Sequence, residues 1–473
     1  VITIGGCSYV EIIGLEITQG RTGIETHYGD NDHITIKDCH IHHFGNVGIR
    51  IASGKQTYFK CIHNHIHHTG VHGEGFYIGD NPGDTKGIPN PEHCEFVNNW
   101  IHNTCYIKNS GNQGDGIELK SGCRSNIIRN NVIHDTKYPC LTLWGTAGGT
   151  LEQNNQVYDN VLIHSLDAVV QVTGETDIFN NIIIGSRDTV RKGLSIEENL
   201  VSGTRLRLAR VFNNTIINLY ARISNKVNLS DSSIFMNNAI YAAKGEGVRF
   251  MGRIDTTAYS SFAGNISYGT PWVTGDTIPG FIRSTQGFSA FLDSLTNFYP
   301  RVNSELKGRG VNLSYVGANA QRDFNGFERG QVWDVGAYQF NPLSAVNTGW
   351  ILKDYNGGFM DTLLTGPISI EAFFSSFDKA DEPLSITVSP NPFKNNTSIS
   401  FKGLSDAKLY NPTKAIFLGV YNIRGQLVEN LTQRLLISGS SGIVWKPYKL
   451  RQNHYFIKLT IGNQAVSKQI TID

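Results

Sequence analysis

The feature that most constrains the fold of this chain is a bend motif that recurs along its first half. In each copy two apolar residues precede two polar ones, usually Asn-Asn, and an isoleucine follows one residue later. Successive copies are 21 to 35 residues apart. A motif repeated at this spacing, with short apolar runs and no helical periodicity between copies, is typical of a chain that winds in regular coils. The clear copies span residues 96–101, 127–133, 178–183, 211–216 and 234–240, and looser ones lie at Cys39, Asn64, Asn160 and Asn265.

The repeat predicts an all-β protein whose main part is a right-handed parallel β-helix, a solenoid with three short strands in each coil. In one coil these strands are residues 116–120, 126–129 and 132–134. Asparagine suits the bend because it tolerates left-handed backbone, and its amide can bond to the asparagine of the next coil. A leucine-rich repeat is a poor alternative because its leucine spacing is absent. The 50 glycines and a charged fraction of only 17% also favour a turn-rich β protein.

The repeat fades after about Tyr268, which places a β-helix with its C-terminal cap in residues 1–340. The segment from Asp323 to Tyr338 resembles the closing segment of many secreted β-helix proteins. It is expected to cover the last coil and shield its edge. Residues 341–382 are predicted to be an irregular linker.

Residues 383–473 alternate apolar and polar positions without the asparagine bend, which predicts a small C-terminal β-sandwich. This region resembles the C-terminal sorting domain of the type IX secretion system, and a fibronectin-like spacer is the alternative. The resemblance implies export by that machinery, removal of the domain, and an extracellular or outer cell surface location. Because residues 1–4 already form a strand pattern, we expect a signal peptide and an N-terminal cap to precede them. The motifs that carry the resemblance are residues 388–393, 420–428, 455–459 and 466–470.

Composition excludes some partners and leaves the cysteines ambiguous. The net charge of +1 gives no electrostatic reason to expect nucleic acid, and no apolar run approaches the ~20 residues of a membrane span. We expect a monomer. All seven cysteines lie in the first third, and they are expected to be small core residues stacked between coils. One or two disulfides remain an alternative for an exported protein.

Alternation along the first strand of each coil predicts a strip of outward side chains. With Ile117 and Leu119 inward, Glu118 and Lys120 face outward, and adjacent coils repeat the pattern about 4.8 Å away. Carboxylates crowd two of these coils and repel one another unless a cation lies between them. Oxygen ligands suit Ca²⁺, whereas an ordinary solvated acidic face is the alternative. The proposed calcium ligands are Glu74, Asp80, Asp115 and Glu118.

Two of these coils resemble those of family nine pectate lyases, which bind calcium through acidic residues in consecutive coils. The stretch Glu74-Gly75-Phe76 resembles the first of their motifs, and residues 115–118 resemble the second. The resemblance implies calcium-dependent β-elimination on an acidic polysaccharide. The chain departs from the family at Gly114, where an acidic ligand is replaced, and at Thr142, which stands where the family has its lysine base.

Lys120 is the candidate base instead, because it lies two residues from Glu118 on the same face. Arg50 is the candidate for the partner arginine that family six lyases use. Tyr77 and Trp144 offer flat rings that stack on sugars, and the same strip places two polar side chains near them. The predicted substrate-binding residues are therefore Tyr77, Trp144, His27 and Thr142.

Two other functions stay open. Thr142 at the lysine position favours a non-catalytic β-helix that binds glycans at the cell surface. A glycoside hydrolase is the third possibility, with Glu74 and Glu118 as its carboxylate pair.

On the third strand of each coil, four histidines share one register and should stack on the outer face, either as a neutral ladder or as ligands of zinc or copper. They are His42, His67, His102 and His134.

Overall fold

The computed structural model describes most of the chain. The chain divides into two compact units, Val1–Ser369 and Ile370–Asp473. The predicted linker, residues 341–382, lies outside the described residues, as do parts of two long insertions, residues 82–89 and 106–112. The described residues are 1–27, 29–81, 90–105, 113–144, 150–184, 193–196, 209–218, 223–225, 233–246, 248–250, 262–270, 280–284, 299–340, 384–402, 404, 416–432, 434–435, 442–447, 450, 452–462 and 464–473.

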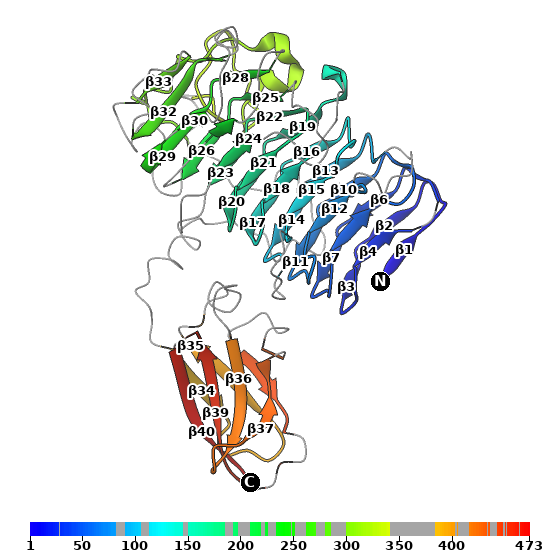
Figure 1. Ribbon diagram of the computed structural model, residues 1–473, viewed down its shortest axis with the longest axis vertical. Helices are drawn as coiled ribbons and strands as arrows, with labels where there is room; N and C mark the ends of the chain where they lie inside the picture. The colour runs from blue at the N-terminus through cyan, green and yellow to red at the C-terminus, as the bar shows by residue number, and fades with distance from the viewer. Residues whose placement is uncertain are drawn as a thin grey trace. The chain divides into compact units, whose positions relative to one another are not determined.

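The first unit is a right-handed parallel β-helix, as the repeat predicts. Three long sheets run along it, and each coil adds one strand to each sheet in turn (Figure 1). The predicted strands of the coil at residues 116–134 are confirmed as β15 (Ile117–Leu119), β16 (Ile127–Arg129) and β17 (Val132–Thr136).

Within each sheet every strand pairs in parallel with the strands before and after it in chain order. The first sheet contains β1 (Ile2–Ile4), β4 (Ile24–Thr26), β8 (Ile49–Ile51), β12 (Phe76–Ile78), β15 (Ile117–Leu119), β18 (Leu141–Leu143), β21 (Val170–Val172), β24 (Leu194–Ile196), β27 (Ile223–Asn225) and β30 (Arg249–Phe250). The second sheet contains β2 (Glu11–Ile13), β6 (Thr35–Lys37), β10 (Lys60–Ile62), β13 (Glu95–Val97), β16 (Ile127–Arg129), β19 (Asn155–Tyr158), β22 (Thr176–Phe179), β25 (Ala209–Phe212), β28 (Ile234–Met236) and β31 (Phe262–Ala263). The third sheet contains β3 (Glu16–Thr18), β7 (His40–His42), β11 (His65–His67), β14 (Trp100–His102), β17 (Val132–Thr136), β20 (Val161–Ser165), β23 (Ile182–Ile184), β26 (Thr215–Asn218), β29 (Ala239–Glu246), β32 (Asn265–Thr270) and β33 (Phe281–Arg283).

Shorter elements complete this unit. A two-residue pair, β5 (Asn31–Asp32) and β9 (Gln56–Thr57), extends the turns of the first coils. The described helical segments are single 3₁₀ turns: η1 (Leu151–Gln153), η4 (Ser314–Val316) and η5 (Ala318–Gln321).

The two residues of the Asn-Asn bend have different structural roles. The first, such as Asn130, adopts left-handed backbone with φ of 57°. The second, such as Asn131, is fully buried and its amide donates to the side-chain oxygen of Asn160, 2.9 Å away in the next coil. The same bond links consecutive coils from Asn64 to Asn265, so a buried amide ladder pairs the second asparagine of each of these bends with the next.

Inward residues of the three sheets stack into one continuous apolar core of isoleucine, valine, leucine and phenylalanine. The cysteines confirm the expectation of small stacked side chains: all seven are free thiols, and six of them are buried. The core therefore repeats along the axis, and each coil is stabilised mainly by its two neighbours.

The closing segment packs along the side of several coils, and not simply over the last coil as the sequence predicts. Trp333 of this segment, with Leu313 that precedes it, packs against Phe179, Phe212 and Met236 of the second sheet. These three side chains stand outward on consecutive coils and form an apolar stripe that the segment covers, which explains its place.

The second unit is the predicted small β-sandwich of antiparallel strands. One sheet has the order β34 (Ser385–Ser389), β35 (Thr397–Lys402), β38 (Gly442–Trp445). The other has the order β37 (Leu427–Asn430), β36 (Ile416–Asn422), β39 (Asn453–Ile461), β40 (Gln464–Ile472). Both bury their apolar faces in one core around Trp445.

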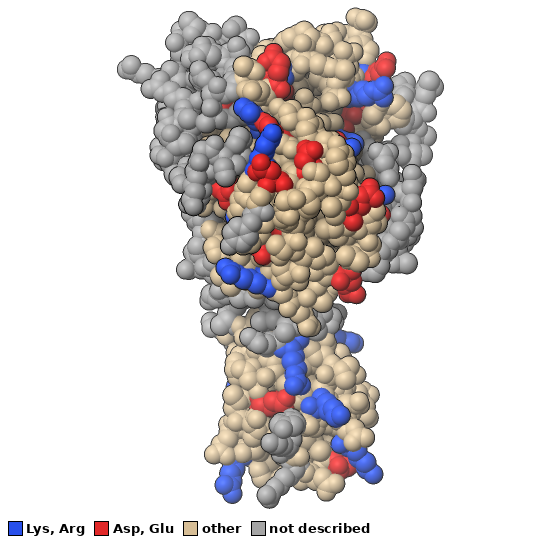
Figure 2. Space-filling view, turned by 90° about the vertical axis from the view of Figure 1, so that its right-hand side faces the viewer, with Lys and Arg blue, Asp and Glu red and all other residues tan. Residues whose placement is uncertain are grey.

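Surface charge is sparse and of mixed sign. Figure 2 shows a face on which acidic and basic side chains are scattered among uncharged residues, in keeping with the net charge of +1. Among the described residues, no helix is long and apolar enough to cross a membrane.

Candidate active site

The candidate site lies on the outer side of the first sheet, over β12, β15 and β18. Tyr77, Glu118 and Thr142 occupy one register column on these three strands. Glu74 lies two residues before β12 begins, and Asp115 lies two residues before β15 begins. Because Phe76 pairs with Ile117, these two acidic residues form a second column. Parallel pairing in register therefore brings residues 41 positions apart in the sequence into adjacent coils.

A glycine after each acidic residue makes this arrangement possible. A β-carbon on Gly116 would lie 2.5 Å from the carbonyl oxygen of Cys140, and one on Gly75 would lie 2.6 Å from that of Gly116. No other residue lets the coils approach so closely here. The glycines fix Glu74 and Asp115 at the edge of the sheet with their side chains beside Glu118.

Glu74, Asp115 and Glu118 form a buried carboxylate cluster. One ligand oxygen from each lies within 4.8 Å of the others. Thr142 donates a hydrogen bond from its hydroxyl to Oδ1 of Asp115. Oε2 of Glu74 is buried and has no hydrogen-bond partner among the described residues. An unpartnered buried carboxylate oxygen is costly, so this atom points to a missing proton or cation.

Burial and mutual repulsion disfavour ionisation of this carboxylate cluster. Burial, and then the nearby Glu118, raise the pKa of Glu74 to about 8. Burial, Glu118 and Glu74 together raise the pKa of Asp115 well above its usual value. Without a cation, the carboxyl groups of Glu74 and Asp115 therefore retain protons near neutral pH.

Lys120 lies at the edge of the carboxylate cluster, between two aromatic rings. Its Nζ donates to Oε1 of Glu118 over 2.6 Å, and lies 4.6 Å from the ring centre of Tyr77 and 5.8 Å from that of Trp144. Burial alone would lower the pKa of Lys120, but Glu118, Tyr77 and Asp115 together outweigh it and the net shift is upward. In this state Lys120 is a paired ammonium, not a free base.

The prediction that Glu118 and Lys120 face outward is right in register, but the expected exposure is wrong. Their exposed fractions are 6% and 8%. Large side chains from the coils on either side, Tyr77 and Trp144, lie against Lys120 and exclude water from it. Low exposure strengthens the electrostatic interactions of this carboxylate cluster.

The structure separates Asp80 and Arg50 from the carboxylate cluster. Arg50 donates from Nη2 to Oδ1 of Asp80, 3.0 Å away, and the other Asp80 oxygen accepts the backbone N–H of Ser53 at 2.8 Å. The structure therefore does not bring Asp80 together with the other three carboxylates, because Asp80 pairs with Arg50 instead. Arg50 stands on the far side of Tyr77, 5.8 Å from its ring centre.

The proposed substrate-binding residues spread along the strip. Tyr77 and Trp144 flank Lys120 and are partly exposed, whereas Thr142 is buried beneath them and bonded to Asp115. His27 is exposed and lies three coils before Lys120, about 14 Å away at the usual strand spacing. The structure thus brings Tyr77, Trp144 and Thr142 to the carboxylate cluster, and His27 lies apart.

Sequence reasoning missed the role of Thr142 as a hydrogen-bond donor to Asp115 and the placing of Lys120 between two rings. The register of the strands, which places Thr142 beside Glu118 and Trp144 beside Lys120, was the signal for both.

Comparison with known families agrees with both units. Residues 1–162 match the family described as right handed beta helix region, and residues 387–473 match the family described as secretion system C-terminal sorting domain. The chain therefore combines a right-handed parallel β-helix with a C-terminal region similar to secretion system sorting domains. The sorting domain indicates export from the cell.

Two solved structures are similar to the chain at low identity. Pectate lyase Pel9A is 14% identical with a TM-score of 0.39, and the match covers 68% of this chain and 73% of that one. The catalytic domain of a GH87 alpha-1,3-glucanase in complex with nigerose is 14% identical with a TM-score of 0.30, over 56% of this chain and 48% of that one. No curated protein matches the sequence.

Proposed function

We propose that the β-helix is a calcium-dependent polysaccharide lyase, which cleaves an acidic polysaccharide by β-elimination. The observation that carries this proposal is the buried trio of Glu74, Asp115 and Glu118, with ligand oxygens within 4.8 Å of one another and one oxygen unpartnered. When all are ionised, three carboxylates and the Lys120 ammonium leave two net negative charges. One divalent cation balances that charge.

The donor set favours calcium over other cations. All the ligand atoms are carboxylate oxygens, which hard cations prefer. The three residues come from two coils, and the flexible coordination geometry of calcium accepts such a set. A bound calcium ion would neutralise the uronate carboxylate of the substrate and acidify the proton beside it.

Lys120 is the proposed base, and its partner Glu118 controls it. While Glu118 accepts the hydrogen bond of Lys120, the ammonium form is favoured. When Glu118 turns its charge to a cation, Lys120 loses that stabilisation and lies beside a positive charge, so its pKa falls. The neutral amine then takes the proton next to the uronate carboxyl group. The electron pair left behind forms the C4–C5 double bond as the C4–O bond to the neighbouring sugar breaks, and the leaving oxygen takes a proton from water.

The surroundings of Lys120 support a glycan substrate. Tyr77 and Trp144 present partly exposed rings on either side of the amine, suited to stacking on sugar rings. Arg50, on the far side of Tyr77 and paired with Asp80, is the proposed hydrogen-bond donor to a second acidic sugar. The sorting domain supports a place of action outside the cell or on its outer surface, where polysaccharides are met.

A second candidate is a glycoside hydrolase, favoured by the raised pKa of Glu74. A carboxyl group with a pKa of about 8 is protonated at neutral pH and can serve as a general acid. Glu118, which accepts the hydrogen bond of Lys120, would be its partner. This function needs no cation.

The deciding experiment digests pectate, alginate and chondroitin sulfate with the full chain, in calcium or in chelator. It follows the ultraviolet absorbance of unsaturated uronates and the appearance of new reducing ends. The proposal predicts that both signals grow with calcium and vanish with chelator. Reducing ends without absorbance would replace it by the hydrolase. If both signals are absent on every polymer, the lyase is rejected in favour of a glycan-binding β-helix.

A further inference from the structure

The third sheet carries a stack of histidines that the candidate active site does not use. Strands β7 and β11 each place two histidines outward, and these pair in register: His40 with His65, and His42 with His67. His42 and His67 stack with ring centres 5.1 Å apart, and the column continues through β14 and β17 at 4.9 Å spacing. The predicted register of this column, from His42 to His134, is confirmed.

Hydrogen bonds run diagonally between side chains of neighbouring coils in this stack. The kind of donor group differs between the two ends of the stack. At β14 the indole N–H of Trp100 donates to Nε2 of His134 over 2.8 Å. An indole nitrogen only donates, so that lone pair is used. At the other end Nε2 of His40 faces Nε2 of His67, also 2.8 Å away. Both atoms there are imidazole nitrogens, and either can present a lone pair.

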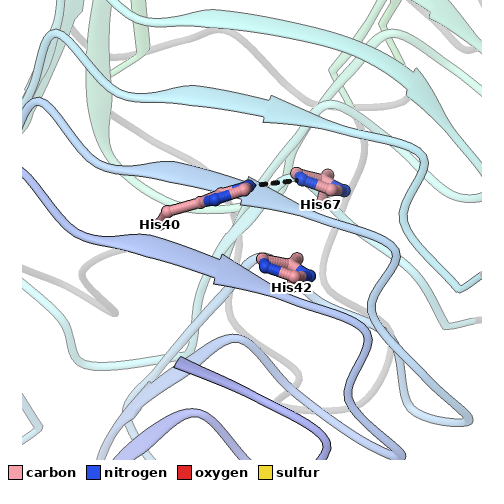
Figure 3. A group of neighbouring side chains, drawn as sticks. All are labelled: His40, His42 and His67. Carbon is pink, nitrogen blue, oxygen red and sulfur yellow. Dashed lines mark hydrogen bonds between the residues drawn. The ribbon is translucent and has the colours of Figure 1, made fainter. Parts of the chain in front are cut away.

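A carboxylate lies beside the pair formed by His40 and His67. Glu16 precedes His40 in the same register column, one coil earlier. Its Oε1 lies 3.1 Å from Nε2 of His42 and 3.9 Å from Nδ1 of His40. Figure 3 shows His40 and His67 pointing toward each other, with His42 stacked beside His67. One nitrogen from each of the three histidines lies within 4.8 Å of the others.

We propose that His40, His42 and His67, with Glu16 as a fourth ligand, bind one borderline divalent transition cation such as Zn²⁺. Three imidazoles and one carboxylate suit this class, whereas calcium prefers oxygen ligands. Zinc ligands at about 2.0–2.1 Å stand about 3.3 Å apart in a tetrahedron, so the nitrogens of His40 and His67 need to separate by only about 0.5 Å. The ion would link the first three coils of the third sheet.

The histidine site is open to solvent on the side of its fourth ligand. The Glu16 side chain is 59% exposed, so a cation can reach the histidine site from solvent.

The test is a titration of the full chain, freed of any affinity tag and treated with chelator, with Zn²⁺ by calorimetry and with Co²⁺ by absorption spectroscopy. The wild type is expected to bind one ion tightly and to give the visible spectrum of tetrahedral Co²⁺. His67→Ala is expected to weaken binding at least tenfold. Glu16→Gln changes an exposed side chain, does not threaten folding, and is expected to weaken binding several-fold. His72→Ala, at an exposed histidine on another face of the coil, is the matched control and should bind as the wild type does.

Two outcomes would overturn this site. The first is a wild type that binds no Zn²⁺. The second is equal affinity in the wild type, His67→Ala and Glu16→Gln, which would place any bound ion elsewhere. Either result would leave the histidine stack as a structural ladder.

Discussion

The carboxylate cluster on the first sheet and the histidine stack on the third arise from the same pattern of strand pairing, but burial shifts their pKa values in opposite directions. In both, parallel pairing in register repeats titratable side chains from coil to coil. Burial raises the pKa of Glu74 to about 8 and lowers that of His40 to about 4. Near neutral pH the acid keeps its proton and the imidazole lacks one, so each cluster avoids buried charge.

This difference separates the two clusters chemically. A carboxyl group must give up its proton before it binds a cation, so calcium binding should release protons and strengthen as pH rises. The imidazoles already present lone pairs. The carboxylate cluster also has Lys120 and two aromatic rings beside it, whereas the histidines bond mainly to one another. In the proposed function, only the first arrangement places a base next to a surface for sugars.

The largest expected effect concerns Lys120. Lys120→Ala removes the proposed base, so kcat on the polysaccharide should fall by about 100- to 10,000-fold while calcium still binds. Lys55→Ala, at an exposed lysine of the same unit, is the control and should keep the wild-type rate. Initial rates of unsaturated uronate formation measure the effect. An unchanged rate in Lys120→Ala would remove it from the chemistry.

The free energy of unfolding should depend on pH through the carboxyl group of Glu74. Between the usual pKa of Glu74, 4.5, and its folded value of about 8, the folded chain holds a proton that the unfolded chain has lost. The free energy of unfolding in chelator should therefore fall as pH rises from 5 to 8, by about 1.4 kcal/mol per pH unit for this group. Urea unfolding at four pH values measures the slope. Glu74→Gln should reduce it, and an equal slope in both proteins would show that Glu74 ionises normally.

Calcium should stabilise the β-helix through the carboxylates alone. At a free concentration of one hundred times Kd, binding adds about 2.7 kcal/mol to the free energy of unfolding. Thermal unfolding with and without calcium measures this gain. It should vanish in Glu74→Gln/Asp115→Asn and persist in His42→Ala/His67→Ala. A gain lost only in the histidine variant would reverse the assignment of the two clusters.

The smallest expected effect concerns Asp80, which lies outside the carboxylate cluster. Asp80→Asn breaks a partly exposed ion pair with Arg50, so stability should fall by no more than about 1 kcal/mol. Calcium affinity, measured by calorimetry, should stay within twofold of the wild type. A tenfold loss would return Asp80 to the ligand set that the sequence pattern predicted.

Much of the fold follows from the sequence because one periodicity controls it. The Asn-Asn bend predicts the coils, the order of three strands and the amide ladder, and register then places Glu118 beside Tyr77. The histidine column follows from the same rule. These features depend only on spacing along the chain and on parallel pairing.

Other features depend on contacts that spacing does not encode. Lys120 is buried because Tyr77 and Trp144 happen to be large and lie in adjacent coils. Asp80 follows its strand closely in sequence, yet the turn directs it to Arg50. The closing segment covers a stripe formed by Phe179, Phe212 and Met236, whose outward positions are known only once the second sheet is assembled.

The most direct test of the calcium site is a calorimetric titration of the chelator-treated chain and of Glu74→Gln/Asp115→Asn with Ca²⁺ at pH 7.5. We predict one calcium ion per wild-type chain, with proton release that differs between buffers of different ionisation enthalpy, and no binding in the double variant. Equal calcium affinity in the two proteins would contradict the assignment of these carboxylates as the metal site, and with it the proposed mechanism.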